Sequence, residues 1–392
     1  MIILKVIAFI FFGCGFIYWL LQLILTLRVI KSVPLLKNLP DMEQKEWSKV
    51  SVVIPARNEA DTIEQAVKLR LQDDYPNLEI LMINDRSTDQ TGKIIDKLAK
   101  LDRRIKAIHI SKLPEKWLGK LYAMHQGVKQ ATGDWFLFSD ADVHIKPGTI
   151  KRAVAYGESR KLDHVAVLPE LLPTNFLLDI TLSTFVRMIC LAGRIWAVED
   201  EKSEAAAGAG AFNLVRRIAF DKTNGFKEIK LESADDVALG RMLRRSGARQ
   251  VLFNGRRYVS VCFYRSLHEM AVGSERATFT SMGNFSLTRL VLISVIMFGL
   301  EMSPFLLLFG GGFSLAPLFG LIMFLIAVIV SILMNKWAHR SLITSFFFPI
   351  GVLIMIIMIL RAGILGVKRG GVIWRGTFYP TEELRQGRRF KF

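Results

Sequence analysis

Two aspartates lie one residue apart, directly after a run of apolar and aromatic side chains. The segment reads FLFSDADVH (residues 136–144), in which Asp140 and Asp142 follow a stretch typical of a buried strand. Carboxylates this close repel one another unless a cation or a hydrogen-bond network compensates their charge. A divalent metal ion is one interpretation, and a pair of solvated turn aspartates is the other.

Similar polar clusters follow two other apolar runs. PARNE (55–59) comes after VSVVI, and NDRSTD (84–89) comes after LEILMI. Strands are predicted at residues 50–54, 78–83, 105–110 and 135–138, with helices between them, the last over residues 121–131. Strands that alternate with helices form parallel sheets, which bind ligands at their carboxyl edge. We therefore predict an α/β fold with a mostly parallel sheet, and a binding site where the three clusters meet.

The sequence also narrows the ligand. The first predicted strand is not followed by G-x-G-x-x-G, and no G-x-x-x-x-G-K-[ST] occurs. An aspartate pair with Mg²⁺ or Mn²⁺ suits a diphosphate, because the metal binds carboxylate and phosphate oxygens together and neutralises a nucleotide diphosphate leaving group. Gly119 and Lys120, at a predicted helix start, would add donors for the same phosphates, although a lysine alone is equally often a surface residue.

Long apolar segments flank this predicted domain. The 392-residue chain is 51% hydrophobic, with a mean hydropathy of +0.33. Residues 2–27 are almost wholly apolar and precede Arg28, Lys31 and Lys37, which predicts an uncleaved transmembrane anchor (1–28) with its basic end in the cytoplasm. The C-terminal membrane region (288–366) holds three further apolar stretches, at residues 290–309, 313–334 and 342–360.

The charges of the C-terminal part bear on which stretches cross the membrane. Glu301 and Pro304 interrupt the first stretch, and the basic tail (367–392) should stay in the cytoplasm. We expect the first stretch to be re-entrant or interfacial, which leaves two true crossings.

One more apolar stretch lies within the predicted catalytic domain (40–285), which the topology places in the cytoplasm. Residues 176–196 carry Asp179, Arg187 and Arg194, and charges at a bilayer centre are costly. This segment is either a helix at the membrane interface or a buried core helix.

The net charge of +17 predicts an anionic partner. Nucleic acid and anionic lipid headgroups are the two candidates. The basic residues gather beside the apolar segments and in the tail, without the aromatic interleaving of single-strand binders. We therefore expect an anionic membrane surface as the partner, and no nucleic acid.

Four segments resemble, in their order and spacing, the motifs of family 2 glycosyltransferases with the GT-A (Rossmann-like) fold: VVIPARNE, INDRSTDQT, SDADVHIKPGTI and ADDVALGRMLRRSG. PEKWLGKLYAMHQG, GAGAFNLVRR and WRGTFYP are similar to the hopene-associated and carotenoid glycosyltransferase branch. The resemblance extends over about residues 48–285. It implies a GT-A catalytic domain between N-terminal and C-terminal transmembrane helices.

The resemblance implies roles for individual residues. The residues that it assigns to the nucleotide-sugar pocket are Pro55, Arg57, Glu59, Asp85, Lys120 and Asp140. Among them, Asp85 would hydrogen-bond the uracil of a UDP-sugar. Asp140 and Asp142 form the metal-binding D-x-D, with Asp142 the better ligand. Asp236 is the catalytic base that takes the acceptor proton, and Asp235 replaces it if the register shifts by one residue. Without the resemblance, these two would be a charge pair stabilised at a helix N-terminus.

The sequence departs from processive family members, which carry Q-x-x-R-W after the base. The corresponding region reads GSERATFTSMGNFS (273–286), in which Arg276 has no adjacent tryptophan. This argues against polymer synthesis and leaves Arg276 open between a phosphate contact and a surface charge.

We expect inverting, metal-dependent transfer of a single sugar from a nucleotide-sugar to a membrane lipid, such as a hopanoid or carotenoid, at the inner cell membrane. The alternatives are a polyprenyl-phosphate glycosyltransferase and a non-catalytic membrane protein that binds nucleotide-sugars.

Overall fold

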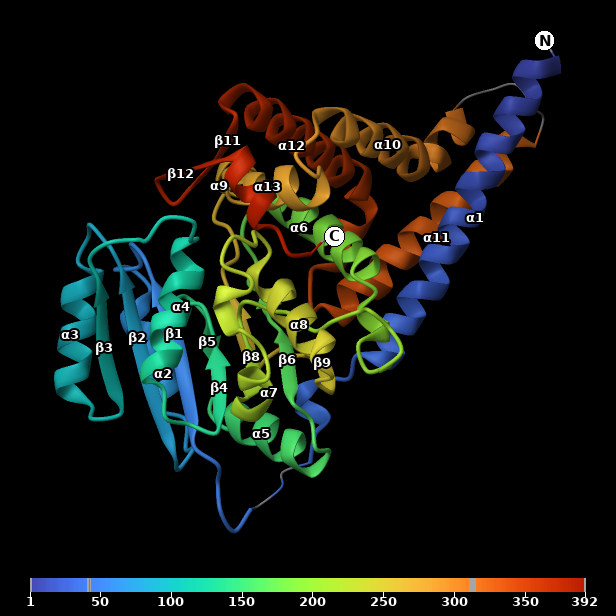
Figure 1. Cartoon of the computed structure of the whole chain (residues 1–392). Helices are drawn as coiled ribbons and strands as arrows, with labels where there is room; N and C mark the ends of the chain where they lie inside the picture. Colours follow the sequence, from blue (N-terminus) through green and yellow to red (C-terminus); the bar gives the residue numbers. More distant parts are fainter. Residues whose placement is uncertain (1, 41, 43, 310–314, 391–392) are drawn as a thin grey trace.

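The computed structural model describes residues 2–40, 42, 44–309 and 315–390. An α/β domain lies below a layer of long helices (Figure 1). The main elements of the α/β domain are β1 (Val50–Ala56), α2 (Ile63–Leu71), β2 (Leu78–Asp85), α3 (Thr91–Leu101), β3 (Ile105–Ile110), α4 (Gly119–Gln130), β4 (Trp135–Phe138), α5 (Thr149–Ser159), β6 (His164–Leu168), β8 (Asn213–Arg216), α7 (Arg217–Asp221), α8 (Asp235–Arg245) and β9 (Gln250–Asn254).

The main sheet is mostly parallel, as predicted. Its strand order is β3-β2-β1-β4-β8-β6-β9, and β8 alone pairs antiparallel with its neighbours. Side chains alternate between the two faces, so Val52 and Ile54 pack with α2, α3 and α5, whereas Val53 packs with α4, α7 and α8. Because both faces are covered, the strands are almost continuously apolar, and polar side chains collect where the strands end.

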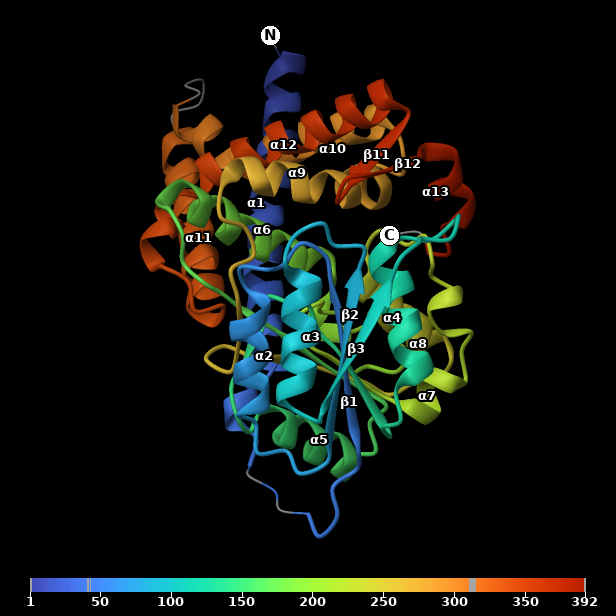
Figure 2. The same cartoon turned by 90° about the vertical axis from the view of Figure 1, so that its left-hand side faces the viewer.

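A second, three-stranded sheet joins β5 (His144–Ile145), β10 (Val259–Val261) and β7 (Glu170–Leu171). From β10 the chain enters α9 (Leu267–Ala277). The chain ends in a hairpin of β11 (Gly371–Trp374) and β12 (Thr377–Pro380), followed by α13 (Thr381–Gly387). Figures 1 and 2 both show this hairpin above the carboxyl edge of the main sheet.

Five helices in the described part of the chain are long and apolar enough to cross a membrane, which indicates a membrane-associated protein. They are α1 (Ile2–Ser32), α6 (Phe176–Ala192), α10 (Leu287–Phe309), α11 (Ala316–Trp337) and α12 (Phe348–Arg369). In both views α1 and α11 lie side by side, and α10 and α12 run crosswise to them (Figures 1 and 2). The predicted start of the second C-terminal stretch, Phe313, lies outside the described residues.

Helix α10 continues through both Glu301 and Pro304. The Glu301 charge is neutralised inside the helical layer: Arg187 of α6 lies 2.7 Å from its Oε2, and the Tyr18 hydroxyl of α1 donates to its Oε1 at 2.5 Å. Arg187 also donates to Gln22 at 3.2 Å. This cluster joins α1, α6 and α10. The number of membrane crossings stays a prediction.

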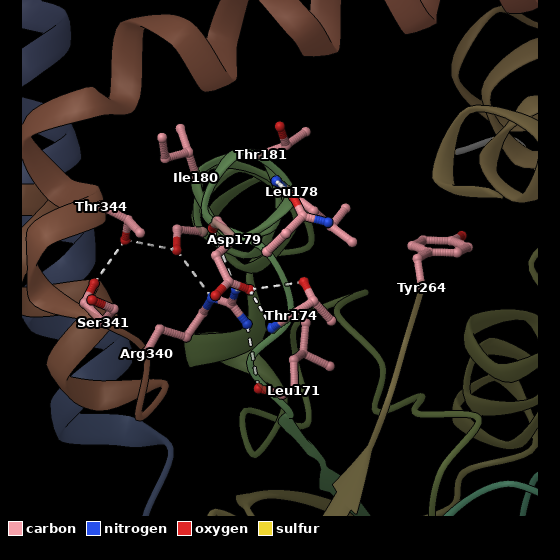
Figure 3. Close-up of polar contacts among 12 residues, drawn as sticks. Leu171, Thr174, Leu178, Asp179, Ile180, Thr181, Tyr264, Arg340, Ser341 and Thr344 are labelled. Carbon is pink, nitrogen blue, oxygen red and sulfur yellow. Dashed lines mark hydrogen bonds and ion pairs between the residues drawn. The ribbon is translucent and has the colours of Figure 1, made fainter. Parts of the chain in front are cut away.

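Helix α6 is packed among the other helices. Besides Arg187, its Asp179 accepts from Arg340 at 3.1 Å, and Arg340 also donates to Ser183 at 3.0 Å. Figure 3 shows the Asp179 and Arg340 side chains pointing toward one another between α6 and the chain that follows α11. Its charges are thus paired within the protein, as the core-helix interpretation requires. Phe176 and Ile189 remain exposed, so part of α6 also faces outward.

Replacing Arg187 with Ala should lower the free energy of unfolding by about 3–5 kcal/mol, because Glu301 would keep a buried charge without its partner. Thermal unfolding in detergent measures this. Lys68→Ala is the control, since it breaks an exposed ion pair with Glu64 within one helix and should leave the free energy of unfolding nearly unchanged. Equal effects of the two changes would contradict a stabilising role for the helical cluster.

Candidate active site

The predicted polar clusters do meet at the carboxyl edge of the main sheet. Pro55 lies near the end of β1, Asp85 ends β2, and Asp140 follows β4. The antiparallel strand β8 starts opposite the end of β4, with Asn213 paired to Phe138, so the segment before β8 joins the same edge. There the Asp140 amide donates to the Gly210 carbonyl at 3.1 Å. A pocket at this point is lined by Pro55, Lys120, Asp140, Asn213, Asp235 and Asp236, among others.

Lys120 is the central cation of this pocket. Its Nζ lies 2.7 Å from Asp140 Oδ1 and 2.9 Å from Asp235 Oδ2. Burial alone would lower the pKa of Lys120, but the two carboxylates outweigh burial and raise it, so the side chain is charged. Lys120 is held between two acidic segments of the site, in contrast to an isolated surface lysine.

Asp235 and Asp236 begin α8 but have different surroundings. Asp235 is buried and faces two cations, Lys120 and Arg276, the latter at 3.7 Å. Burial raises the pKa of Asp235, but these cations outweigh it and bring the pKa below its ordinary value. Asp236 is only partly buried and accepts from the amides of Gly210 at 3.1 Å and Val237 at 2.8 Å. Burial and the Asp235 charge raise the pKa of Asp236. Of the two, Asp236 has the environment of a base.

The segment before β8 approaches the Asp140 side chain and the backbone of α8 closely at its two glycines. A Cβ on Gly210 would lie 2.8 Å from Asp140 Oδ2, and one on Gly208 would lie 2.6 Å from the Asp236 carbonyl oxygen. These glycines allow the backbone to bridge the D-x-D segment and α8.

The D-x-D segment rests on a buried arginine. Arg70 of α2 donates from Nη2 to the Ser139 hydroxyl at 2.9 Å and to the Asp140 carbonyl at 2.7 Å. Asp142 is crowded by acidic neighbours, and burial together with Asp140 and Glu59 raises its pKa to about 6. A carboxylate in this situation favours a bound cation.

The residues present fit a divalent metal ion that is shared with a diphosphate. No group of three or more His, Cys, Asp or Glu side chains among the described residues is arranged to hold a metal ion. Asp140 and Asp142 would supply two oxygens, and phosphate oxygens and water the rest, as Mg²⁺ and Mn²⁺ sites often do.

The predicted nucleoside side of the site is formed by Asp85 and its neighbours. Asp85 accepts from Arg86 Nε at 2.7 Å and from its Nη2 at 3.2 Å. A Cβ on Gly119 would overlap the Asp85 carboxylate, so the start of α4 closely approaches the end of β2. Because Gly119 precedes Lys120, this contact connects Asp85 to the pocket. Arg57 and Glu59 lie beside this region but contact the C-terminal hairpin.

Sequence reasoning missed the contribution of the C-terminal hairpin to the site. Arg276 lies over the Trp374 ring, with the guanidinium carbon 3.8 Å from the ring centroid. An arginine–tryptophan pair is thus formed in space, although the two residues are 98 positions apart in the sequence. The sequence WRGTFYP (374–380) could have drawn attention to the hairpin. A sequence motif alone does not show which surface of the fold the segment covers.

Part of this chain is similar to known glycosyltransferases. Residues 51–178 match the sequence model of glycosyl transferase family 2. An uncharacterized glycosyltransferase of Haemophilus influenzae is 36% identical over 120 residues, which are 30% of this chain and 35% of that protein. The 4,4'-diaponeurosporenoate glycosyltransferase of Staphylococcus aureus is 23% identical over 218 residues, which are 55% of this chain and 56% of that protein. The chain thus matches about a third to a half of the length of these relatives.

A solved structure extends the comparison to the whole fold. The mannosyltransferase PcManGT from Pyrobaculum calidifontis, in complex with GDP-Man and Mn²⁺, superposes with a TM-score of 0.56 at 16% identity, covering 93% of this chain and 98% of that chain. Together with the mostly parallel sheet, these matches show a glycosyltransferase fold of the GT-A type, within which residues 51–178 match glycosyl transferase family 2.

Proposed function

We propose that the protein is an inverting glycosyltransferase that moves a single sugar from a nucleotide-sugar, a UDP-sugar, to a lipid in the membrane. The observation that carries the proposal is the meeting of Asp140, Asp236 and Lys120 at one sheet edge, with Asp142 close enough to Asp140 for their charges to interact. It provides acidic ligands for a metal, a cation for phosphate and a base within a single site. The match to glycosyl transferase family 2 supports the reaction class.

In the proposed reaction, the acceptor hydroxyl oxygen attacks the anomeric carbon of the sugar, and the bond from that carbon to the diphosphate oxygen breaks. The acceptor proton goes to the Asp236 carboxylate, and the bonding electrons leave with the nucleoside diphosphate. A bound Mg²⁺ or Mn²⁺, held by Asp140 and Asp142, would supply positive charge for the leaving group. Lys120 would hold the D-x-D segment and α8 together while the charge develops.

The arrangement of the chain supports a lipid acceptor. The catalytic domain lies directly beneath the helical layer, and α9 and the hairpin lie between them (Figures 1 and 2). A water-insoluble acceptor in the membrane would reach the carboxyl edge of the sheet from that side. The similarity to a diaponeurosporenoate glycosyltransferase favours an isoprenoid acceptor over other lipids. We place the enzyme in the inner membrane, with its catalytic domain in the cytoplasm.

Membranes containing the protein should transfer label from a UDP-sugar to an organic-extractable lipid in the presence of Mn²⁺. The experiment tests several radiolabelled UDP-sugars and GDP-mannose, followed by identification of the labelled lipid. The same membranes with the D236N variant are the control. Label in a polyprenyl phosphate would favour the alternative acceptor. Absence of both labelled lipid and donor hydrolysis, with every donor, would refute the enzymatic proposal.

A further inference from the structure

The C-terminal hairpin is anchored to the loop that follows β1. Arg375, at the turn of the hairpin, has Nη1 2.9 Å from Glu59 Oε1, and it donates to the Arg57 carbonyl at 2.9 Å. Its φ of 46° and the φ of 77° at Gly376 form the tight turn that directs this side chain at the loop. Residues at opposite ends of the sequence thus share one side of the site.

Tyr379 provides a second anchor on the same side. Its side chain is 4% exposed and belongs to the apolar cluster that contains Leu118 and Leu121 at the start of α4. The turn of the hairpin also reaches Arg57, because a Cβ on Gly376 would lie 3.9 Å from Arg57 Nη2. The hairpin therefore covers the region between the β1 loop and Gly119, beside Asp85.

Arg276 lies at the start of the hairpin, and some of its N–H groups have no acceptor among the described residues. Arg276 is stacked on Trp374 at 3.8 Å and has one ion pair, to Asp235 at 3.7 Å. Its Nε and Nη1 are buried and have no hydrogen-bond partner among the described residues. Buried donors without acceptors cost free energy. Phosphate oxygens suit a guanidinium group, because it donates through two parallel N–H groups.

We propose that the C-terminal hairpin forms one wall of the donor site: Trp374 holds Arg276 for the diphosphate, and Arg375 closes the nucleoside end beside Asp85. This inference rests on the proposed function and extends it, because it assigns binding of a nucleoside diphosphate to residues far outside the matched family domain. The hairpin directly follows α12 in the chain, so the donor site is completed by a segment that leaves the helical layer.

The test is calorimetric binding of UDP, and separately of GDP, to the full-length protein in detergent with Mn²⁺. W374A and R375A should each weaken binding of the preferred nucleotide by roughly 10- to 100-fold. R385A is the matched control, an exposed arginine of the same C-terminal segment whose ion pair with Glu382 is 3.7 Å long. It should bind within about twofold of wild type.

Three further variants separate an effect on binding from an effect on folding. W374F keeps an aromatic ring under Arg276 and should retain affinity, whereas W374L has an apolar side chain without a ring and should lose it. R276K should lose much of the preference for UDP over uridine, because it removes the bidentate donor.

Affinity equal to wild type in W374A and R375A would overturn the inference, whatever the enzyme transfers. Wild-type binding of a nucleotide without any lipid product would leave the inference standing and remove the proposed acceptor. Failure of the wild type to bind either nucleotide would overturn both.

Discussion

The D236N variant should turn over its donor about 10²- to 10⁴-fold more slowly than wild type, the usual contribution of a general base. Asn keeps the shape of the side chain and an oxygen that can accept from the Gly210 and Val237 amides. It cannot take the acceptor proton. UDP affinity should change by less than about threefold, because the described ion pairs of Lys120 and Arg276 at this helix start are made with Asp235. The measurement is single-turnover transfer at saturating donor, with calorimetry for binding.

D235N is the matched comparison and should behave differently. Asp235 accepts from Lys120 at 2.9 Å and lies 3.7 Å from Arg276, so removing its charge leaves two buried cations with less compensation. The variant should lose stability, and its donor affinity should change along with its turnover. If D235N abolishes the chemical step and D236N keeps more than about a tenth of it, the base is Asp235 and the assignment to Asp236 is wrong.

The elements that form the acidic side of this site were predictable from the sequence. The strands expected at 105–110 and 135–138 coincide with β3 and β4, and the run 50–54 falls within β1. Apolar β-branched runs of this length have few alternatives when both faces of a sheet are covered. Their ends therefore place Pro55, Asp85 and Asp140 at one edge without knowledge of any long-range contact.

The contacts made by the end of the chain were not predictable in this way. Glu232 accepts from the backbone amides of Arg389 and Phe390 at 2.5 and 2.7 Å, and Glu59 pairs with Arg375. Basic residues in the tail were interpreted as attraction to lipid headgroups, because composition gives the sign of a charge but not its partner. The same limit applies to Glu301, whose partner Arg187 lies 114 residues away in the sequence.

Without metal, the D142N variant should be more stable than wild type. It should also lose most of the stabilisation that Mn²⁺ with UDP gives the wild type. Burial, Asp140 and Glu59 raise the pKa of Asp142 to about 6. Ionised Asp142 thus destabilises the folded state at neutral pH, and this penalty grows as the pH rises from the ordinary aspartate value through 6. Asn removes it, and a gain of about 1 kcal/mol would raise Tm by roughly 2–4 °C.

When Mn²⁺ and UDP are added in the same experiment, the wild type should gain more stability than D142N. Mn²⁺ with UDP at about 100 times the Kd should stabilise the wild type by about 2.7 kcal/mol, and D142N should lose most of this increment. Asp61→Asn, at an exposed aspartate, is the control and should leave both Tm and the increment unchanged. A D142N protein that is less stable than wild type without metal, or that keeps the full increment, would contradict a cation site at Asp142. Carboxylates that crowd together destabilise the fold when no metal is bound. If D142N gains stability without metal and loses its stabilisation by Mn²⁺ with UDP, metal binding is the reason why these carboxylates lie together.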